Sequence, residues 1–126
     1  MTTIVDADVL IGILRGVEEA REAVNGARRR GERMMSIAPV RVEVLRGVRR
    51  GEEAVTHGLL SRLEWIAVDV DLADRAGDLG RTYRESHAGI ETVDLLLAAA
   101  AERFGAVLLT RNVRHFPMFP ALRPAF

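Results

Sequence analysis

Residues 90–116, with the sequence IETVDLLLAAAAERFGAVLLTRNVRHF, predict a helix, a glycine stop, a short strand and a polar loop. Thr92 is the predicted N-cap, because its hydroxyl can accept a hydrogen bond from a free amide of the first helical turn. Residues 95–101 are apolar on every side, so we expect a helix that is buried on most faces. Gly105 suits the left-handed conformation in which many helices end. Residues 106–109 show no polar alternation, which is typical of an interior parallel strand.

Polar residues stand at both ends of this apolar segment. Asp94 lies in the first turn of the predicted helix, and Thr110, Arg111 and Asn112 follow the predicted strand. In open parallel sheets, ligands bind beyond the carboxyl ends of the strands. The segment therefore predicts a buried scaffold that carries an acid at its beginning and an amide at its end.

The rest of the chain alternates between strand and helix patterns. Strands are predicted at residues 3–5, 33–37 and 65–68, and helices at residues 7–14, 17–30, 39–50, 52–63 and 71–86. A last edge strand is expected near Leu122. This alternation indicates an α/β fold with a short parallel β-sheet flanked by helices on both faces, in one domain over residues 1–126.

The composition narrows the class of protein. A chain of 126 residues with 48% hydrophobic residues is large enough for one domain with a real core. No apolar run approaches the ~20 residues of a membrane span, and the N-terminus does not resemble a signal peptide. The absence of Cys excludes disulfides and thiolate zinc sites. We therefore expect a cytoplasmic protein without membrane association. The net charge of zero argues against a generally basic nucleic-acid coat.

Three acidic residues lie beside apolar segments and not on a polar surface face, so solubility does not explain them. Asp6 directly follows the first strand, Glu43 shares a helix face with apolar residues, and Asp94 opens the buried helix. Such acids would repel one another at one rim of the sheet, and a hard divalent cation, Mg²⁺ or Mn²⁺, would make their approach favourable. A metal held in this way can activate water for phosphodiester hydrolysis. Asn112 could position a metal-bound water or a phosphate oxygen without adding charge.

Each of these residues also has an ordinary structural interpretation. Asp94 could complement the dipole of its helix, and either Asp6 or Asp8 could cap the first helix. Glu43 could form a weak ion pair with an arginine one turn further on, and Asn112 could be a turn residue. The conjunction favours a site, because all of them fall at strand or helix ends compatible with one rim.

Two other kinds of site are disfavoured. His57, His87 and His115 have no i, i+4 pairing, so we expect surface or loop residues and not zinc ligands. The pair Asp6 and Asp8 after an apolar strand also suggests a HAD-type phosphatase, in which the first acid is the nucleophile and the second the acid/base. That family uses a downstream basic residue that is nearly always lysine, and this chain contains no lysine.

Three blocks of the sequence resemble the PIN-domain ribonucleases, most closely the VapC-type toxins of bacterial toxin–antitoxin pairs. They are IVDADVLIGIL at residues 4–14, SIAPVRVEVLRG at residues 36–47 and the longest and most specific block, GIETVDLLLAAAAERFGAVLLTRNVRHF, at residues 89–116. The resemblance implies a single PIN-like domain that cleaves RNA, with tRNA or rRNA as the expected substrate, and leaves 5′-phosphate and 3′-hydroxyl ends. It also implies a homodimer and a cognate VapB-type antitoxin, which blocks the site and joins the toxin in binding operator DNA.

The resemblance also assigns roles to the site residues. The family's metal-binding acids fall on Asp6, Glu43 and Asp94, with Mg²⁺ or Mn²⁺ as the metal, and its fourth position, often Asp, falls on Asn112. We expect Asp6 and Asp94 to ligate the metal directly and Glu43 to act through water. Asp8 stands where the family usually has a hydroxyl or Asn, and it is expected to add an outer-shell ligand. The neutral Asn112 favours one tightly held metal over two.

Arginines are the candidates for holding the RNA. Arg46, Arg111 and Arg114 stand close in sequence to the candidate acids, and arginine makes bidentate contacts to phosphate. Each could instead be a solvent-facing partner in an ion pair. The alternative to the enzyme is a non-catalytic PIN-fold module that binds only RNA or a partner protein. The survival of three of the four acids favours catalysis.

Overall fold

Four parallel strands form one sheet in the order β3-β2-β1-β4. The computed structural model describes residues 1–126, and its strands are β1 (Thr2–Val5), β2 (Arg33–Ile37), β3 (Glu64–Ile66) and β4 (Val107–Leu109). Strand β1 is central and pairs with β2 on one side and with β4 on the other. Because every pair is parallel, the carboxyl ends of all four strands meet at one edge of the sheet.

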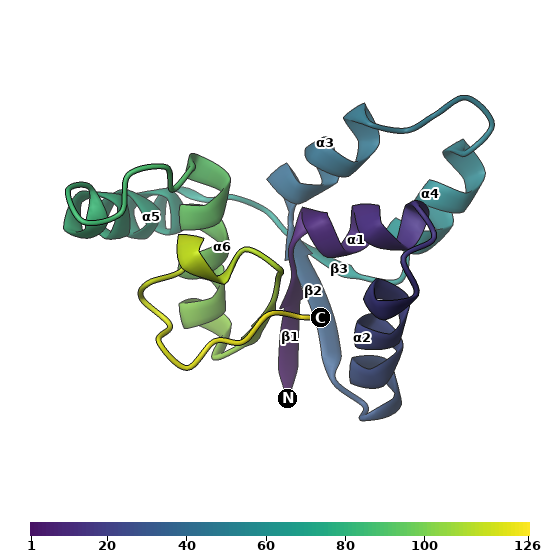
Figure 1. Ribbon diagram of the computed structural model, residues 1–126. Helices are drawn as coiled ribbons and strands as arrows, with labels where there is room; N and C mark the ends of the chain where they lie inside the picture. Colours follow the sequence, from purple (N-terminus) through teal and green to yellow (C-terminus); the bar gives the residue numbers. More distant parts are fainter.

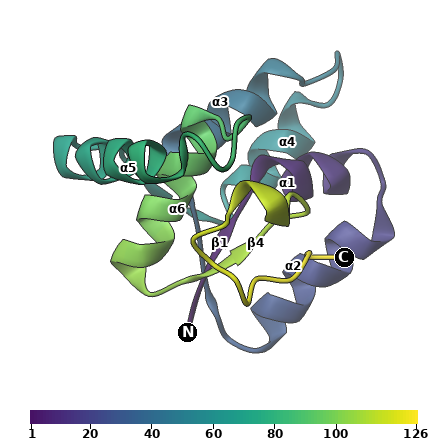
Figure 2. The same cartoon turned by 60° about the vertical axis from the view of Figure 1, so that its left-hand side comes forward.

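Helices cover both faces of this sheet, as the sequence predicts (Figures 1 and 2). Helices α5 and α6 lie on one side, and α1, α2 and α4 lie on the other. The helices are α1 (Ala7–Leu14), α2 (Glu18–Arg29), α3 (Ala38–Arg46), α4 (Glu53–Leu60), α5 (Val70–Tyr83) and α6 (Thr92–Phe104), and a 3₁₀-helix, η1, spans Val113–His115. None of the helices combines the length and apolar character that crossing a membrane requires.

Helix α6 forms the centre of the core, which confirms the predicted buried helix. Its residues 96–101, two leucines followed by four alanines, are all buried. One side of the helix packs on β1 and β2 and the other on α5, which leaves these central residues little contact with solvent. Glycine on α5 allows this close packing, because a Cβ added at Gly80 would lie 2.8 Å from Leu95 Cδ1.

Some predicted element ends are wrong. The N-cap of α6 is Glu91, not Thr92, because Glu91 and Asp94 form a capping box in which each side chain accepts the other residue's backbone N–H. The helix predicted at residues 39–50 ends at Arg46, and no strand forms near Leu122. The other predicted elements are present, with ends that move by a turn or less.

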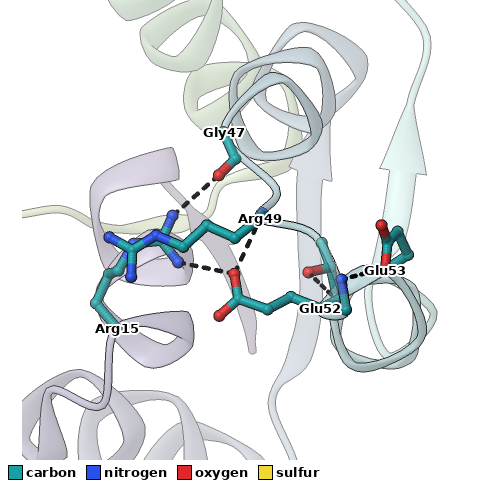
Figure 3. A network of polar contacts seen from close by, with 7 residues as sticks. Arg15, Gly47, Arg49, Glu52 and Glu53 are labelled. Carbon is teal, nitrogen blue, oxygen red and sulfur yellow. Dashed lines mark hydrogen bonds and ion pairs between the residues drawn. The ribbon is translucent and has the colours of Figure 1, made fainter.

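An arginine at the end of α1 holds the loop between α3 and α4 (Figure 3). Arg15 Nη2 donates to the carbonyl oxygen of Gly47 at 2.9 Å, and its Nη1 donates to Glu52 Oε1 at 3.3 Å. Helix α1 begins directly after Asp6, and α3 carries Glu43. The link therefore fixes the relative position of two helices that place two of the candidate acids.

Gly105 adopts the left-handed conformation at the end of α6, two residues before β4 begins, and this conformation allows a test of the fold. Gly105 has a φ of 57°, so Gly105→Ala should lower the free energy of unfolding by about 1 kcal/mol, measured by urea unfolding. Gly77→Ala is the matched control, because Gly77 is an exposed residue of α5 with nothing within 4 Å of an added Cβ. It should raise stability by about 0.5–1 kcal/mol. Equal stabilities of the two variants would contradict this account.

Candidate functional site

The crevice between the carboxyl ends of β1 and β4 holds the candidate site. The chain leaves β1 toward β2 and β3 on one side and returns to β4 on the other, so the strand order reverses beside β1. This is the position at which open parallel sheets bind ligands. Asp6 follows β1, Asn112 follows β4, Glu43 comes from α3, and Asp94 comes from the first turn of α6. All four predicted residues line one cavity of about 190 Å³.

Four further residues line the same cavity: Asp8, Glu91, Val93 and His115. His115, expected to be a surface or loop residue, lies partly exposed on η1 and also lines this cavity, with its Nδ1 3.1 Å from Asp94 Oδ2. Glu91 reaches the cavity because it caps α6 one turn before Asp94. The Glu-x-x-Asp spacing of a capping box was the available sequence signal for Glu91, whereas nothing local marks His115.

Asp6 is a buried carboxylate with two hydrogen bonds. Its Oδ1 accepts the N–H of Ala7 at 2.7 Å, which makes Asp6 the N-cap of α1, and its Oδ2 accepts the hydroxyl of Thr110 at 2.8 Å. These bonds favour the charged form. Burial, together with the negative charge of Asp8, outweighs them and raises the pKa of Asp6 from 3.8 to about 6.

Asp8 contains an unsatisfied oxygen. Its Oδ2 accepts the backbone N–H of Arg111 at 2.9 Å, but its Oδ1 is the one buried side-chain nitrogen or oxygen of the chain that has no hydrogen-bond partner. Burial also raises the pKa of Asp8. A buried carboxylate oxygen without a partner is costly, so this atom needs either a proton or a cation.

Glu43 and Asp94 are two further acids that line the cavity. Burial raises the pKa of Glu43, the positive charge of Arg46 opposes this shift, and the neighbouring acids add to it. Asp94 Oδ2 accepts the N–H of Glu91 at 3.0 Å and faces His115. As the side chains stand, no group of three or more His, Asp or Glu residues is close enough to enclose a metal ion. Ligation by these acids would therefore require side-chain rotation, with Asp94 turning from His115.

None of the three predicted RNA-binding arginines lines this cavity. Arg46 borders an adjoining groove of about 590 Å³ that shares Glu43 and Glu91 with the cavity. The guanidinium of Arg111 lies 4.7 Å from the ring centroid of Phe126. Arg114 is exposed on η1. Arg46 therefore supplies positive charge beside Glu43 without forming part of the cavity wall.

The raised pKa of Asp6 predicts how the metal-free protein responds to pH. The folded state holds this proton up to about pH 6 and the unfolded chain only to about pH 3.8, so the free energy of unfolding falls as the pH rises through this window. Asp6→Asn removes the effect, which is worth roughly 3 kcal/mol at most. In EDTA, the Asn variant should therefore gain stability relative to the wild type between about pH 4 and about pH 7, measured by urea unfolding.

Asp74→Asn serves as the control for that experiment, because it removes a carboxylate from the exposed surface of α5. Its stability should follow the wild-type pH profile. Parallel profiles for Asp6→Asn and the wild type would contradict the assignment of a raised pKa to Asp6.

Comparison with known proteins identifies the family. The model of the PIN domain matches residues 3–119. Ribonuclease VapC19 of Mycobacterium tuberculosis is 42% identical over 123 residues, which cover 98% of each chain. Ribonuclease VapC10 of the same organism is 41% identical over 98% of this chain and 92% of its own.

Solved structures show the same fold. A toxin–antitoxin complex from Klebsiella pneumoniae contains a chain with a TM-score of 0.84 at 23% identity, covering 99% of this chain and 98% of that one. DNA-bound VapBC from Salmonella typhimurium has a TM-score of 0.76 at 24% identity, covering 98% and 96%. The chain belongs to the PIN-domain family, and within it to the VapC proteins.

Proposed function

We propose that this chain is a metal-dependent endoribonuclease that acts as the toxin of a toxin–antitoxin pair. One observation carries the proposal: five carboxylates, those of Asp6, Asp8, Glu43, Glu91 and Asp94, line a single cavity that contains no arginine. Two relatives with 42% and 41% identity are named ribonucleases, which supports RNA as the substrate. We infer that tRNA or rRNA is cut and that the protein acts in the cytoplasm.

The donor set fits a hard divalent cation. Carboxylate oxygens are the ligands that Mg²⁺ and Mn²⁺ prefer, and the unpartnered Asp8 Oδ1 supplies a buried oxygen that a cation would satisfy. A cavity of about 190 Å³ also leaves room for an ion that keeps part of its water shell. We assign the metal to Asp6 and Asp94 directly, and to Glu43 and Asp8 through water.

A metal held by Asp6 and Asp94 would lower the pKa of a bound water and would offset the negative charge of the scissile phosphate. Glu43, whose pKa is raised by burial, orients the attacking water and accepts its proton. Asn112 lines the cavity as a neutral donor, and its amide group can hold a phosphate oxygen. The water oxygen forms a bond to phosphorus, the bond from phosphorus to the 3′ oxygen breaks, and the 3′ oxygen takes a proton from solvent, which gives 5′-phosphate and 3′-hydroxyl ends.

Arg46 and Arg114 are the proposed contacts to flanking phosphates. Both are exposed, and Arg46 borders the groove that adjoins the acidic cavity. Arg111 differs from them, because its guanidinium already lies against Phe126. Contacts of this kind position the RNA without reading its sequence.

The proposed partners are a VapB-type antitoxin and a second copy of the chain. Neighbours of known structure are toxin–antitoxin complexes, which supports the antitoxin. A groove of about 420 Å³ suits an acidic amphipathic helix, because it combines apolar residues from α1, α2 and α4 with the arginines Arg21, Arg28 and Arg62. The zero net charge of the chain fits contact with operator DNA only through the antitoxin.

Cleavage of end-labelled total tRNA and rRNA by the purified chain is the direct test. With Mn²⁺, the wild type should produce discrete fragments, EDTA should abolish them, and Asp94→Ala should slow their formation at least ~100-fold, as expected when one electrostatic stabiliser is lost. Asp74→Asn should cut like the wild type. RNA binding in a gel-shift assay without cleavage, unaffected by Asp94→Ala, would instead support a non-catalytic binding module.

Metal binding should also appear as thermal stabilisation. A ligand that binds only the folded state at 100 times its dissociation constant adds about 2.7 kcal/mol, so millimolar Mn²⁺ or Mg²⁺ should raise the melting temperature by several degrees. Asp6→Asn should reduce this gain, whereas Asp74→Asn should retain it. If the gain is the same in Asp6→Asn as in the wild type, Asp6 is not a ligand.

A further inference from the structure

Residues 117–126 run from η1 back across the sheet toward α1 and α2, where the chain ends (Figures 1 and 2, yellow). Near its end, this segment contacts the residues that follow β4. The N–H of Ala125 donates to the carbonyl oxygen of Thr110 at 2.7 Å. The ring of Phe126 lies under the guanidinium of Arg111, 4.7 Å from its central carbon, and rests against Gly12 of α1, where an added Cβ would be 3.9 Å from the ring.

The residues contacted in this way are the ones that hold two of the acids. The hydroxyl of Thr110 donates to Asp6 Oδ2 at 2.8 Å, and the N–H of Arg111 donates to Asp8 Oδ2 at 2.9 Å. The N–H of Asn112 donates to Thr110 Oγ1 at 3.1 Å, which orients that hydroxyl toward Asp6. Residues 110–112 therefore set the positions of both carboxylates.

Residues 110–112 lie outside the strands and helices, although Thr110 is buried and the N–H of His115 donates to the carbonyl oxygen of Asn112 at 3.0 Å. They follow β4, a strand of three residues at the edge of the sheet that pairs only with β1. Arg111 and Asn112 are exposed, and short edge strands with exposed backbone are among the first segments of a fold to open. The contacts from Ala125 and Phe126 therefore add to the bonds with Asp6 and Asp8 in holding this segment.

We propose that Phe126 is a positioning residue for the acidic site. Its ring holds the Arg111 side chain by a cation–π contact, and with the bond from Ala125 to Thr110 it fixes residues 110–112, and through them Asp6 and Asp8. The consequence for metal binding rests on the proposed function. Phe126 touches neither RNA nor metal in this account and acts only through the geometry of Arg111 and Thr110.

Three substitutions separate this role from general packing. Phe126→Leu keeps an apolar side chain against Gly12 but removes the aromatic face, whereas Phe126→Tyr keeps that face. Leu122→Ala is the control, because Leu122 is also half-buried between residues 117 and 126 but lies in an apolar pocket beside β4. All three variants are compared in the full chain after circular dichroism has shown native secondary structure.

Two measurements report on the proposal. Isothermal titration with Mn²⁺ should show about tenfold weaker binding for Phe126→Leu, the size of effect expected when support behind a ligand is lost. Phe126→Tyr and Leu122→Ala should bind like the wild type. Amide hydrogen exchange, recorded without metal, should show about tenfold faster exchange at Arg111 and Asn112 in Phe126→Leu only.

The outcomes are distinct. Unchanged exchange and affinity in Phe126→Leu would overturn the proposal, and so would equal losses in Phe126→Leu and Leu122→Ala, which would indicate general destabilisation. If the wild type binds no Mn²⁺, the proposed metal site fails. The exchange measurement then still decides the positioning role, because faster exchange restricted to Phe126→Leu supports it and unchanged exchange refutes it.

Discussion

Strands β1 and β4 pair in a register that places Val5 beside Leu109, and the residues that follow, Asp6 and Thr110, are joined by a buried hydrogen bond of 2.8 Å. This bond connects residues 104 positions apart, and the crevice between the two strands depends on it. The pairing is possible because helix α6, whose residues 96–101 are buried on all sides, brings the chain back against β1 before β4 begins. A core element thus determines the geometry of a polar site.

The same acids can cap helices and also form the candidate site, so these two interpretations do not exclude each other. Asp6 caps α1 and also lines the cavity, and Asp94 completes the capping box of α6 while facing the same space. A helix N-terminus favours a negative charge, so it can hold a carboxylate in place at low cost. The unfavourable energy arises because several acids are buried close together. Burial raises the pKa of Asp6, Asp8 and Glu43, and neighbouring acids add to the shift of Asp6 and Glu43. The site is therefore less stable than its individual hydrogen bonds imply.

Local sequence patterns predict the alternation of strands and helices and the acids at the ends of these elements, but they do not show contacts between distant segments. The alternation of strand and helix, and the acids at element ends, are local signals that the structure confirms in position. His115 was missed because its approach to Asp94 depends on how η1 folds over α6. The strand expected near Leu122 does not form, since Pro120 and Pro124 flank it and proline cannot donate to a sheet ladder. The same prolines leave residues 117–126 as an irregular segment that reaches back to Arg111.

The distribution of charge follows from these constraints. Five of the 18 acidic residues line one cavity of about 190 Å³ that contains no arginine, so negative charge is concentrated there in a protein whose net charge is zero. A phosphodiester would be repelled from such a cavity, and the arginines that could attract it, such as Arg46, border the adjoining groove. Under the proposed function, the cation must therefore be bound before the scissile phosphate can enter, whereas the flanking phosphates can already contact arginine. Metal and RNA should then bind with positive cooperativity, because each reduces the electrostatic cost of binding the other.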